Sequence, residues 1–308
     1  MLYLTLIYSL VIILLTYNFK KKRLFSNYTG DRNQLFSNKK NIPLVGGIFL
    51  LVPIILINYQ NLNYNILVIL VFLIGFFSDR KILISPKKRF LFQVTLVFFS
   101  VILLDLEIVS SRLTLFDKLL QNSTFNIIFT SFCLLILING SNFIDGLNGL
   151  LLSYMTFIIL ILLKLDLLYG LKINQNFIVY FIAFMSIMIL LNLSNFLMLG
   201  DAGAYVLSFL VGYLIIKCHY LNPYVSPYFF ITLIWYPCFE NLFSVIRKLK
   251  KKFSPFTPDN NHLHQLLLQF GLKKKMIKNR LAANNFSSIV ISLCNFLIIL
   301  ISSLNPYS

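Results

Sequence analysis

The chain consists largely of long apolar runs separated by shorter polar segments, and this pattern narrows the folds open to it. Ten runs follow one another along the 308 residues, and most approach the ~20 apolar residues that a helix needs to cross a bilayer. The sequence therefore predicts an all-α, polytopic integral membrane protein with about ten transmembrane helices. The runs lie at about 2–19, 42–59, 64–78, 90–106, 124–140, 149–165, 176–197, 203–218, 226–246 and 285–304.

The composition supports a membrane protein and excludes an ordinary soluble domain. Hydrophobic residues make up 58% of the chain and charged residues only 12%, which is far from the usual soluble balance. A net charge of +17 would suggest nucleic acid as the partner of a soluble protein. In a membrane protein it reflects cationic loops that meet anionic headgroups, so we expect the lipid bilayer as partner and no nucleic acid. The four cysteines show no CxxC spacing and are predicted to be apolar core residues.

The lysines and arginines predict the orientation of the chain in the membrane. The N-terminal apolar run precedes its cations, the reverse of a secretory signal, so we expect it to be retained with the N-terminus outside. Loops 20–41, 79–89 and 247–284 contain 7, 5 and 10 of the 27 Lys and Arg residues, and such loops face the cytoplasm. Both termini are then outside. The prediction is a single transmembrane domain, 1–308, with cytoplasmic segments at about 20–41, 79–89, 140–149, 197–203 and 247–284.

Acidic residues and imidazoles gather at the same predicted inner face. Only four acids fall in predicted outer loops: Asp105, Glu107, Asp117 and Asp166. The inner-face set is Asp31, Asp79, Asp145, Asp201, Glu240, Asp259, His262 and His264. Carboxylates, imidazoles and cations together suit a phosphorylated, metal-bound substrate. The site is therefore predicted on the cytoplasmic face.

The segment 142–150 is the most distinctive of the polar stretches. Asp145 lies there between two asparagines, Asn142 and Asn148, and close to two glycines, Gly146 and Gly149, at the mouth of an apolar run. Glycines let a backbone approach a ligand closely, and amides supply donors and acceptors. An aspartate in this position is costly unless it meets water, a cation or a partner. The alternative is a polar turn in which Asp145 caps a helix.

Two further aspartates stand at predicted helix ends. Asp79 closes a membrane helix, where the helix dipole disfavours an anion. This suggests a use in metal binding or proton abstraction, with a salt bridge to Arg80 or Lys81 as the alternative. Asp201 precedes an apolar helix beside two glycines. It could cap that helix or bind Mg²⁺, which keeps substrate phosphates in its coordination shell.

Cations and imidazoles complete the candidate set. Lys39 and Lys40 precede a helix start broken by proline and glycine, and Lys88 and Arg89 lie in segment 85–93. They could meet phosphate, or snorkel to the membrane surface. His262 and His264 follow two prolines and a run of cations. A His-x-His without further ligands does not make a zinc site, whereas contact with phosphate oxygens is compatible with its surroundings.

In combination these segments resemble the polyprenyl-phosphate N-acetylhexosamine-1-phosphate transferases (glycosyltransferase family 4), which include bacterial enzymes that start O-antigen, enterobacterial common antigen and teichoic acid linkage units. Asn142–Leu150 is similar to the family's Asn-x-x-Asp-Gly-Leu-Asp-Gly-Leu signature. Leu199–Ala204 is similar to Gly-Asp-x-Gly-Ser, and Ser254–His264 to Ser-Pro-Phe-x-Pro-Asp-x-x-His-x-His. The last match favours these hexosamine-1-phosphate transferases over the related muramoyl-pentapeptide translocase. The similarity runs from about residue 39 to 265.

The resemblance implies a function: transfer of an N-acetylhexosamine 1-phosphate from a UDP-sugar to undecaprenyl phosphate, with release of UMP. This would start a bacterial cell-surface polysaccharide at the inner membrane. Asp201 would hold Mg²⁺, with Mn²⁺ as a substitute. A homodimer is compatible with the family. Catalytic roles fall to Asp79, Asp145, His262 and His264, and substrate contacts to Asn142, Asn148, Asn192 or Asn195, Lys39, Lys40, Lys88 and Arg89.

Some positions depart from the family pattern. Ser78 stands first in what is usually an Asp-Asp pair, so a proton acceptor at that position would be missing. A lipid phosphate already ionised near neutral pH does not need one. Asn148 replaces the later Asp of the signature, and Glu240 stands where Asp is frequent. Two other hypotheses follow: a catalytically altered family member, and a transporter or flippase of a lipid-linked or anionic solute, which midplane charges and inverted repeats would favour.

Overall fold

The chain is built from helices throughout the part described by the computed structural model, namely residues 2–26, 42–57, 59–168, 171, 175–255, 261–274, 277 and 279–307. An isolated parallel bridge between Leu44 and Met198 is the one β-type contact found there, so the predicted all-α class is confirmed. The helices are α1 (Leu2–Lys21), α3 (Gly46–Ile57), α4 (Leu62–Asp79), α5 (Pro86–Leu103), α6 (Thr114–Leu120), α7 (Ser123–Ile144), α8 (Leu150–Lys164), α9 (Gln175–Leu193), α10 (Gly200–Leu221), α11 (Pro227–Leu233), α12 (Trp235–Lys250), α13 (Leu263–Lys273) and α14 (Arg280–Ser302).

Every predicted apolar run contains a helix, but not every one of these helices is long enough to cross a membrane. Within the described residues, α4, α7, α9, α10 and α14 are long and apolar enough to cross a membrane. The run at 226–246 is divided into α11 and α12, which meet at a bend of 75° and add a sixth candidate if they form one broken span. Helices α3 and α8 are apolar but shorter. The chain is a multi-pass membrane protein, and the ten spans with both termini outside remain a prediction.

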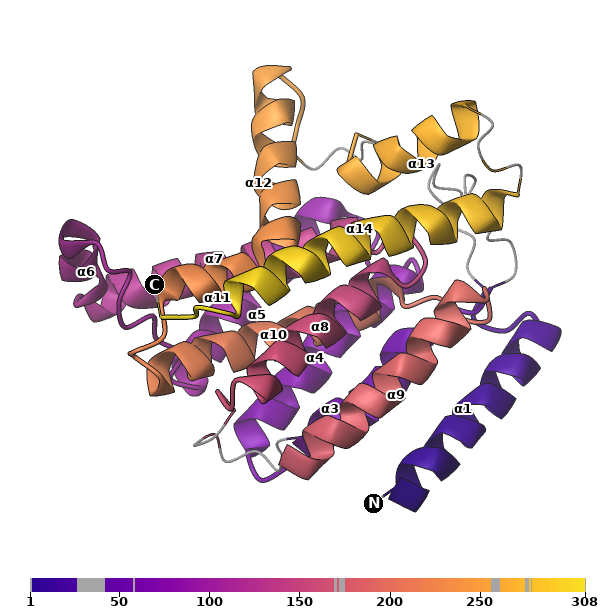
Figure 1. Ribbon diagram of the computed structural model, residues 1–308, viewed down its shortest axis with the longest axis horizontal. Coiled ribbons are helices and arrows are strands. Elements are labelled where there is room, and N and C mark those ends of the chain that lie inside the picture. Colours follow the sequence, from indigo (N-terminus) through magenta and orange to yellow (C-terminus); the bar gives the residue numbers. More distant parts are fainter. Residues whose placement is uncertain are drawn as a thin grey trace.

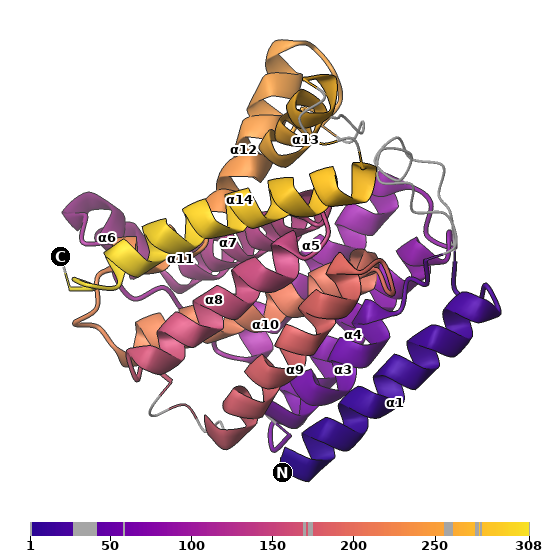
Figure 2. The same ribbon diagram turned by 45° about the vertical axis from the view of Figure 1, so that its right-hand side comes forward.

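Helix α10 forms the centre of the molecule (Figures 1 and 2). Every residue from Ala202 to Ile216 is buried, because α3, α4, α7 and α8 all pack against it. A helix that is hydrophobic all round is expected in such a position. Glycines let the neighbours come close: a Cβ added at Gly75 would lie 2.4 Å from the Cα of Ala202. Backbone contact of this kind is typical of membrane helix pairs and fixes where α10 begins relative to the end of α4.

The bend between α11 and α12 has a local cause at Pro237. Proline has no backbone N–H, so the carbonyl four residues earlier, at Leu233, loses its helical donor. The buried Tyr154 hydroxyl donates to that carbonyl at 2.8 Å. On the other side α7 approaches at Gly140, where an added Cβ would lie 2.0 Å from the Pro237 carbonyl oxygen. Helix α12 therefore turns away from α11 and packs along α7, and its end projects from the bundle, as Figure 1 shows.

Several predicted inner-face segments meet at one end of the helices. The backbone N–H of Gly46 donates to the Met198 carbonyl at 3.0 Å, and that of Met198 donates to Pro43 at 2.9 Å. The Lys20 ammonium at the end of α1 donates to the Asn195 carbonyl at 3.0 Å. Helix α14 runs over α8 and reaches the same end through α13 (Figure 2). The sequence places these segments on one face, and the structure shows that they are in contact.

Candidate active site

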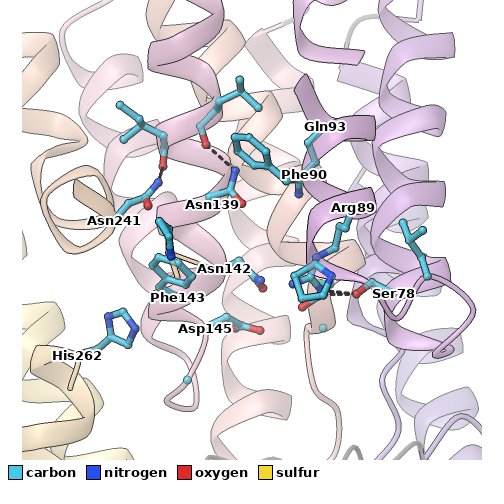
Figure 3. A pocket seen from close by; sticks show the side chains of 18 of the residues that line it. Ser78, Arg89, Phe90, Gln93, Asn139, Asn142, Phe143, Asp145, Asn241 and His262 are labelled. Atoms are coloured by element: carbon cyan, nitrogen blue, oxygen red, sulfur yellow. Dashed lines mark hydrogen bonds and ion pairs between the residues drawn. The ribbon is translucent and has the colours of Figure 1, made fainter. Parts of the chain in front are cut away.

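A cavity of about 920 Å³ opens between the ends of α4, α5, α7, α10 and α12. Its wall combines carboxylates, cations, amides and apolar side chains, and Figure 3 shows how they lie. Ser78, Arg89 and Asp145 lie toward one end of that view, and Gln93, Asn139 and Asn241 toward the other. The cavity brings together six residues predicted from the sequence: Asp79, Arg89, Asn142, Asp145, Asp201 and His262.

Asp79 caps a helix other than its own. One carboxylate oxygen accepts from the backbone N–H of Asp201 at 2.9 Å, and the other from that of Ala202 at 3.1 Å. The first turn of a helix leaves such N–H groups without helical partners, and its dipole favours an anion. The unfavourable end of α4 is thus offset by the favourable start of α10. The predicted alternative partner Arg80 places its guanidinium over the Phe25 ring, 4.4 Å from the centroid.

Gly200 makes this cap sterically feasible. Its φ is +75°, in the left-handed region that residues with a side chain rarely adopt. A Cβ at this position would lie 2.6 Å from a carboxylate oxygen of Asp79. Glycine therefore lets the chain turn into α10 while the carboxylate sits against its first turn.

Asp201, the predicted metal ligand, takes part in a three-residue network. Its Oδ2 accepts from the Ser78 hydroxyl at 2.6 Å and from the Arg89 guanidinium at 2.8 Å. The same guanidinium nitrogen donates to the Ser78 hydroxyl oxygen at 2.6 Å. About a quarter of each charged side chain is exposed, 28% for Arg89 and 23% for Asp201. Ser78, the departure from the family pattern, thus bridges the aspartate and the arginine.

Helix α7 presents one stripe of side chains to the cavity. Leu135, Asn139, Asn142 and Phe143 line it at the spacing of neighbouring helical turns, followed by Asp145 just beyond the helix end. The Asn139 amide donates to the Leu135 carbonyl at 3.0 Å. The polar end of this stripe lies in the 142–150 segment, whereas Asn139 is hidden in the apolar run before it.

His262 is held by a carboxylate from α12. Its Nδ1 lies 2.9 Å from an oxygen of Glu240, and both side chains are buried. The other Glu240 oxygen accepts from the backbone N–H of Leu263 at 2.9 Å, at the start of α13. The Phe143 ring lies against the imidazole with centroids 4.9 Å apart. Glu240 therefore fixes the orientation of a histidine that faces the cavity, a role that sequence reasoning did not assign to it.

His264 lies behind the cavity wall. It is completely buried, and its ring is stacked 5.7 Å from that of His262. A Cβ added at Gly146 would lie 2.6 Å from its Nε2. This histidine therefore supports the turn that carries Asp145, and a direct contact with diphosphate remains a prediction.

Three of the four asparagines predicted to bind substrate, Asn148, Asn192 and Asn195, form a separate cluster with two residues of α14. The Asn148 amide donates to Asn195 Oδ1 at 2.9 Å, and the Asn148 backbone N–H donates to Asn284 Oδ1 at 2.9 Å. Asn192 Oδ1 accepts from the Gly149 backbone. The Asn285 amide donates to the Leu193 carbonyl at 2.9 Å. The cluster ties the Asp145 turn to α9 and α14 and lies outside the cavity wall.

Of the remaining predicted cations, the structure describes only Lys88. Lys88 is exposed in the first turn of α5 and does not line the cavity. Lys39 and Lys40 lie outside the described residues. The wall also contains Gln93, Asn139, Asn241 and Lys248, which the sequence reading did not single out. Their only signal was a polar residue inside or at the edge of an apolar run.

The carboxylates of the cavity could supply part of the ligand set of a divalent cation such as Mg²⁺. Carboxylates are the hard oxygen donors that Mg²⁺ prefers, and it usually takes one or two of them together with water and substrate phosphates. Asp79, Asp145 and Asp201 line one cavity. Among the described residues, no group of three or more His, Cys, Asp or Glu side chains is arranged to hold a metal by itself. The donors therefore suit a cation that shares its ligands with a phosphorylated substrate.

The helical bundle and this cavity define a multi-pass membrane protein with an acidic and cationic site where its helices end. Comparison with known proteins gives its family. The chain belongs to Glycosyl transferase family 4, which it matches over residues 61–219. This confirms the resemblance inferred from the motifs.

Individual relatives share only a modest part of their sequence with this chain. The chain is 28% identical over 258 residues to a protein of Salmonella typhi named undecaprenyl-phosphate alpha-N-acetylglucosaminyl 1-phosphate transferase, covering 76% of this chain and 67% of the relative. It is 28% identical to proteins of the same name from Yersinia pestis and Escherichia coli K12. Those two matches cover 49% of this chain and 43% of the relatives, so the chain spans less than half of their length there.

Proposed function

We propose that the protein transfers an N-acetylhexosamine 1-phosphate from a UDP-sugar to undecaprenyl phosphate, releasing UMP, at the cytoplasmic face of a bacterial inner membrane. The product would start a cell-surface polysaccharide. The observation that carries this proposal is the cavity in which Asp79, Asp145, Asp201, Arg89 and His262 meet. Family membership and the names of the relatives support it.

The chemistry requires positioning and charge neutralisation more than covalent help from the protein. An oxygen of the lipid phosphate attacks the phosphorus that carries the sugar, a new P–O bond forms, and the bond to UMP breaks. Arg89, His262 and Asp145 line the same cavity, where Arg89 and His262 would meet phosphate oxygens. The lipid phosphate is already ionised near neutral pH, so Ser78 in place of a carboxylate does not remove a necessary proton acceptor.

Asp201, with Asp145 nearby, would hold a divalent cation. Bound Mg²⁺ would neutralise charge that develops on the phosphate oxygens. Asp79 would act by fixing the start of α10 and with it the position of Asp201, because its oxygens accept from the α10 backbone. The apolar side chains of the wall, among them Phe132 and Leu242, suit an isoprenoid chain.

A reconstituted transfer assay tests this function. Purified protein would receive undecaprenyl phosphate, Mg²⁺ and a panel of UDP-N-acetylhexosamines, beginning with UDP-N-acetylglucosamine because the relatives' names contain that sugar. We expect UMP release and entry of sugar label into the lipid phase with one donor. Both signals should be lost with EDTA and in Asp201→Asn, and kept in Lys118→Gln, a control on α6.

Two other outcomes would redirect the assignment. Donor binding without UMP release would favour a catalytically altered family member, for which the Ser78 hydroxyl on Asp201 is the relevant observation. A folded protein that neither binds a UDP-sugar nor releases UMP would favour the transporter hypothesis.

A further inference from the structure

Arg89 forms an ion pair with Asp201, the residue proposed to bind the metal. Its guanidinium lies 2.8 Å from Asp201 Oδ2, and the Ser78 hydroxyl donates to the same oxygen at 2.6 Å. We infer that Arg89 is an internal counter-cation of Asp201, which lowers the affinity of the free protein for a divalent cation until a diphosphate draws the guanidinium away. The inference rests on the proposed function and adds a coupling to it: the cation binds tightly only when the diphosphate of the donor is also bound.

Charge and geometry support such competition. A divalent cation at Asp201 would face the positive charge of Arg89 across one shared oxygen atom, and like charges in a partly enclosed site repel strongly. About a quarter of each side chain is exposed, so water reaches both groups when the guanidinium exchanges its partner, and the incoming cation then compensates the charge of Asp201. A diphosphate offers it several anionic oxygens, to which guanidinium groups bind in a bidentate manner.

Ser78 makes this arrangement possible in this chain. Its hydroxyl accepts from Arg89 while donating to Asp201, so it bridges the pair without adding charge. A carboxylate at residue 78 would offer Arg89 a second anion and would add a negative charge beside Asp201. Ser78→Asp should therefore release part of Asp201 from Arg89 and strengthen cation binding.

The test measures binding of Mn²⁺ alone, by electron paramagnetic resonance of the free ion, and binding of UDP alone without metal. Wild type, Arg89→Gln and Lys87→Gln would be compared, the last being an exposed cation in the first turn of the same helix that does not line the cavity. We expect Arg89→Gln to bind Mn²⁺ at least ~10-fold more tightly and UDP ~10-fold more weakly, a change of about 1.4 kcal/mol in each direction. Lys87→Gln should match wild type in both.

Opposite changes in the two affinities distinguish this role from structural damage, which would weaken both. Equal Mn²⁺ affinity in Arg89→Gln and wild type would overturn the inference, even if UDP binding and transfer are normal. Should Arg89→Gln fail to fold, Ser78→Asp decides: tighter Mn²⁺ binding supports the inference, and unchanged or weaker binding contradicts it. A wild-type protein that binds no UDP under any condition would instead contradict the proposed function.

Discussion

Gly200 shows how strongly one residue can constrain this site. Its positive φ and its 2.6 Å approach to Asp79 leave no room for a side chain. We predict that Gly200→Ala lowers the free energy of unfolding by roughly 1–3 kcal/mol and disturbs the cap on α10. Thermal unfolding in detergent measures the loss. Gly271→Ala is the matched control, because a Cβ there meets nothing within 4 Å, and equal behaviour of the two variants would refute the steric account.

Glu240 is a second residue whose role is positional. Because it holds His262 Nδ1 at 2.9 Å and the start of α13, we predict that Glu240→Gln lowers kcat by about 10–100-fold, as loss of an orienting carboxylate often does. The KM for the UDP-sugar should change much less. Steady-state kinetics of the transfer reaction measure this. Glu107→Gln, at an acid of the predicted outer face, serves as the control. An unchanged kcat in Glu240→Gln would contradict the role of Glu240 in orienting His262.

The residues of the site were only partly predictable. Asp145, Asp201 and His262 stand out because charged or polar residues interrupt apolar runs, and they do line the cavity. The capping of α10 by Asp79 depends on how α4 and α10 pack, which no local pattern shows. Likewise, the hydrogen bond between Asn148 and Asn284 joins residues 136 positions apart, so the sequence could not show the amide cluster, and a substrate contact of Asn148 stays a prediction.

The broken pair α11 and α12 leads to a prediction about a whole element. Tyr154 supplies the hydrogen bond that Pro237 cannot, at the Leu233 carbonyl. Tyr154→Phe would leave that buried carbonyl without its donor, at a cost of about 1–3 kcal/mol. Thermal unfolding should show this loss, and transfer activity should fall because α12 carries Glu240. Tyr228→Phe, at a half-exposed tyrosine of α11, should change neither quantity, and an equally unchanged Tyr154→Phe would contradict the role given to the Tyr154 hydroxyl at this bend.

Element boundaries follow from local chemistry more readily than element geometry does. The apolar runs predicted where the long helices lie, whereas α13 falls in the predicted cytoplasmic segment 247–284, outside every apolar run. The 75° bend was not predicted, although Pro237 signals it, since hydrophobicity runs through the break without interruption. The twelve residues of α3 and fifteen of α8 also show that an apolar run can exceed the helix within it.

At the scale of the molecule, the orientation in the membrane is open to direct measurement. The distribution of cations predicts that residue 251 lies inside, and residues 113 and 304 outside. Single cysteines would be introduced as Lys251→Cys, Leu113→Cys and Leu304→Cys, all at exposed positions, in a chain freed of its four native cysteines. We expect a membrane-impermeant maleimide to label residues 113 and 304 in intact cells, and residue 251 only after permeabilisation. The reverse pattern would invert the topology and place the cavity on the other face.

Transfer of a sugar 1-phosphate is tested by following the phosphorus atom that carries the sugar. Purified protein would be supplied with undecaprenyl phosphate, Mg²⁺ and UDP-N-acetylglucosamine labelled with radioactive phosphorus at the sugar-linked phosphate and with tritium in the sugar. We expect both labels to enter the lipid in a one-to-one ratio while UMP is released. Tritium that enters the lipid without the phosphorus label would show transfer of the sugar alone and would contradict the proposed transfer of a sugar 1-phosphate.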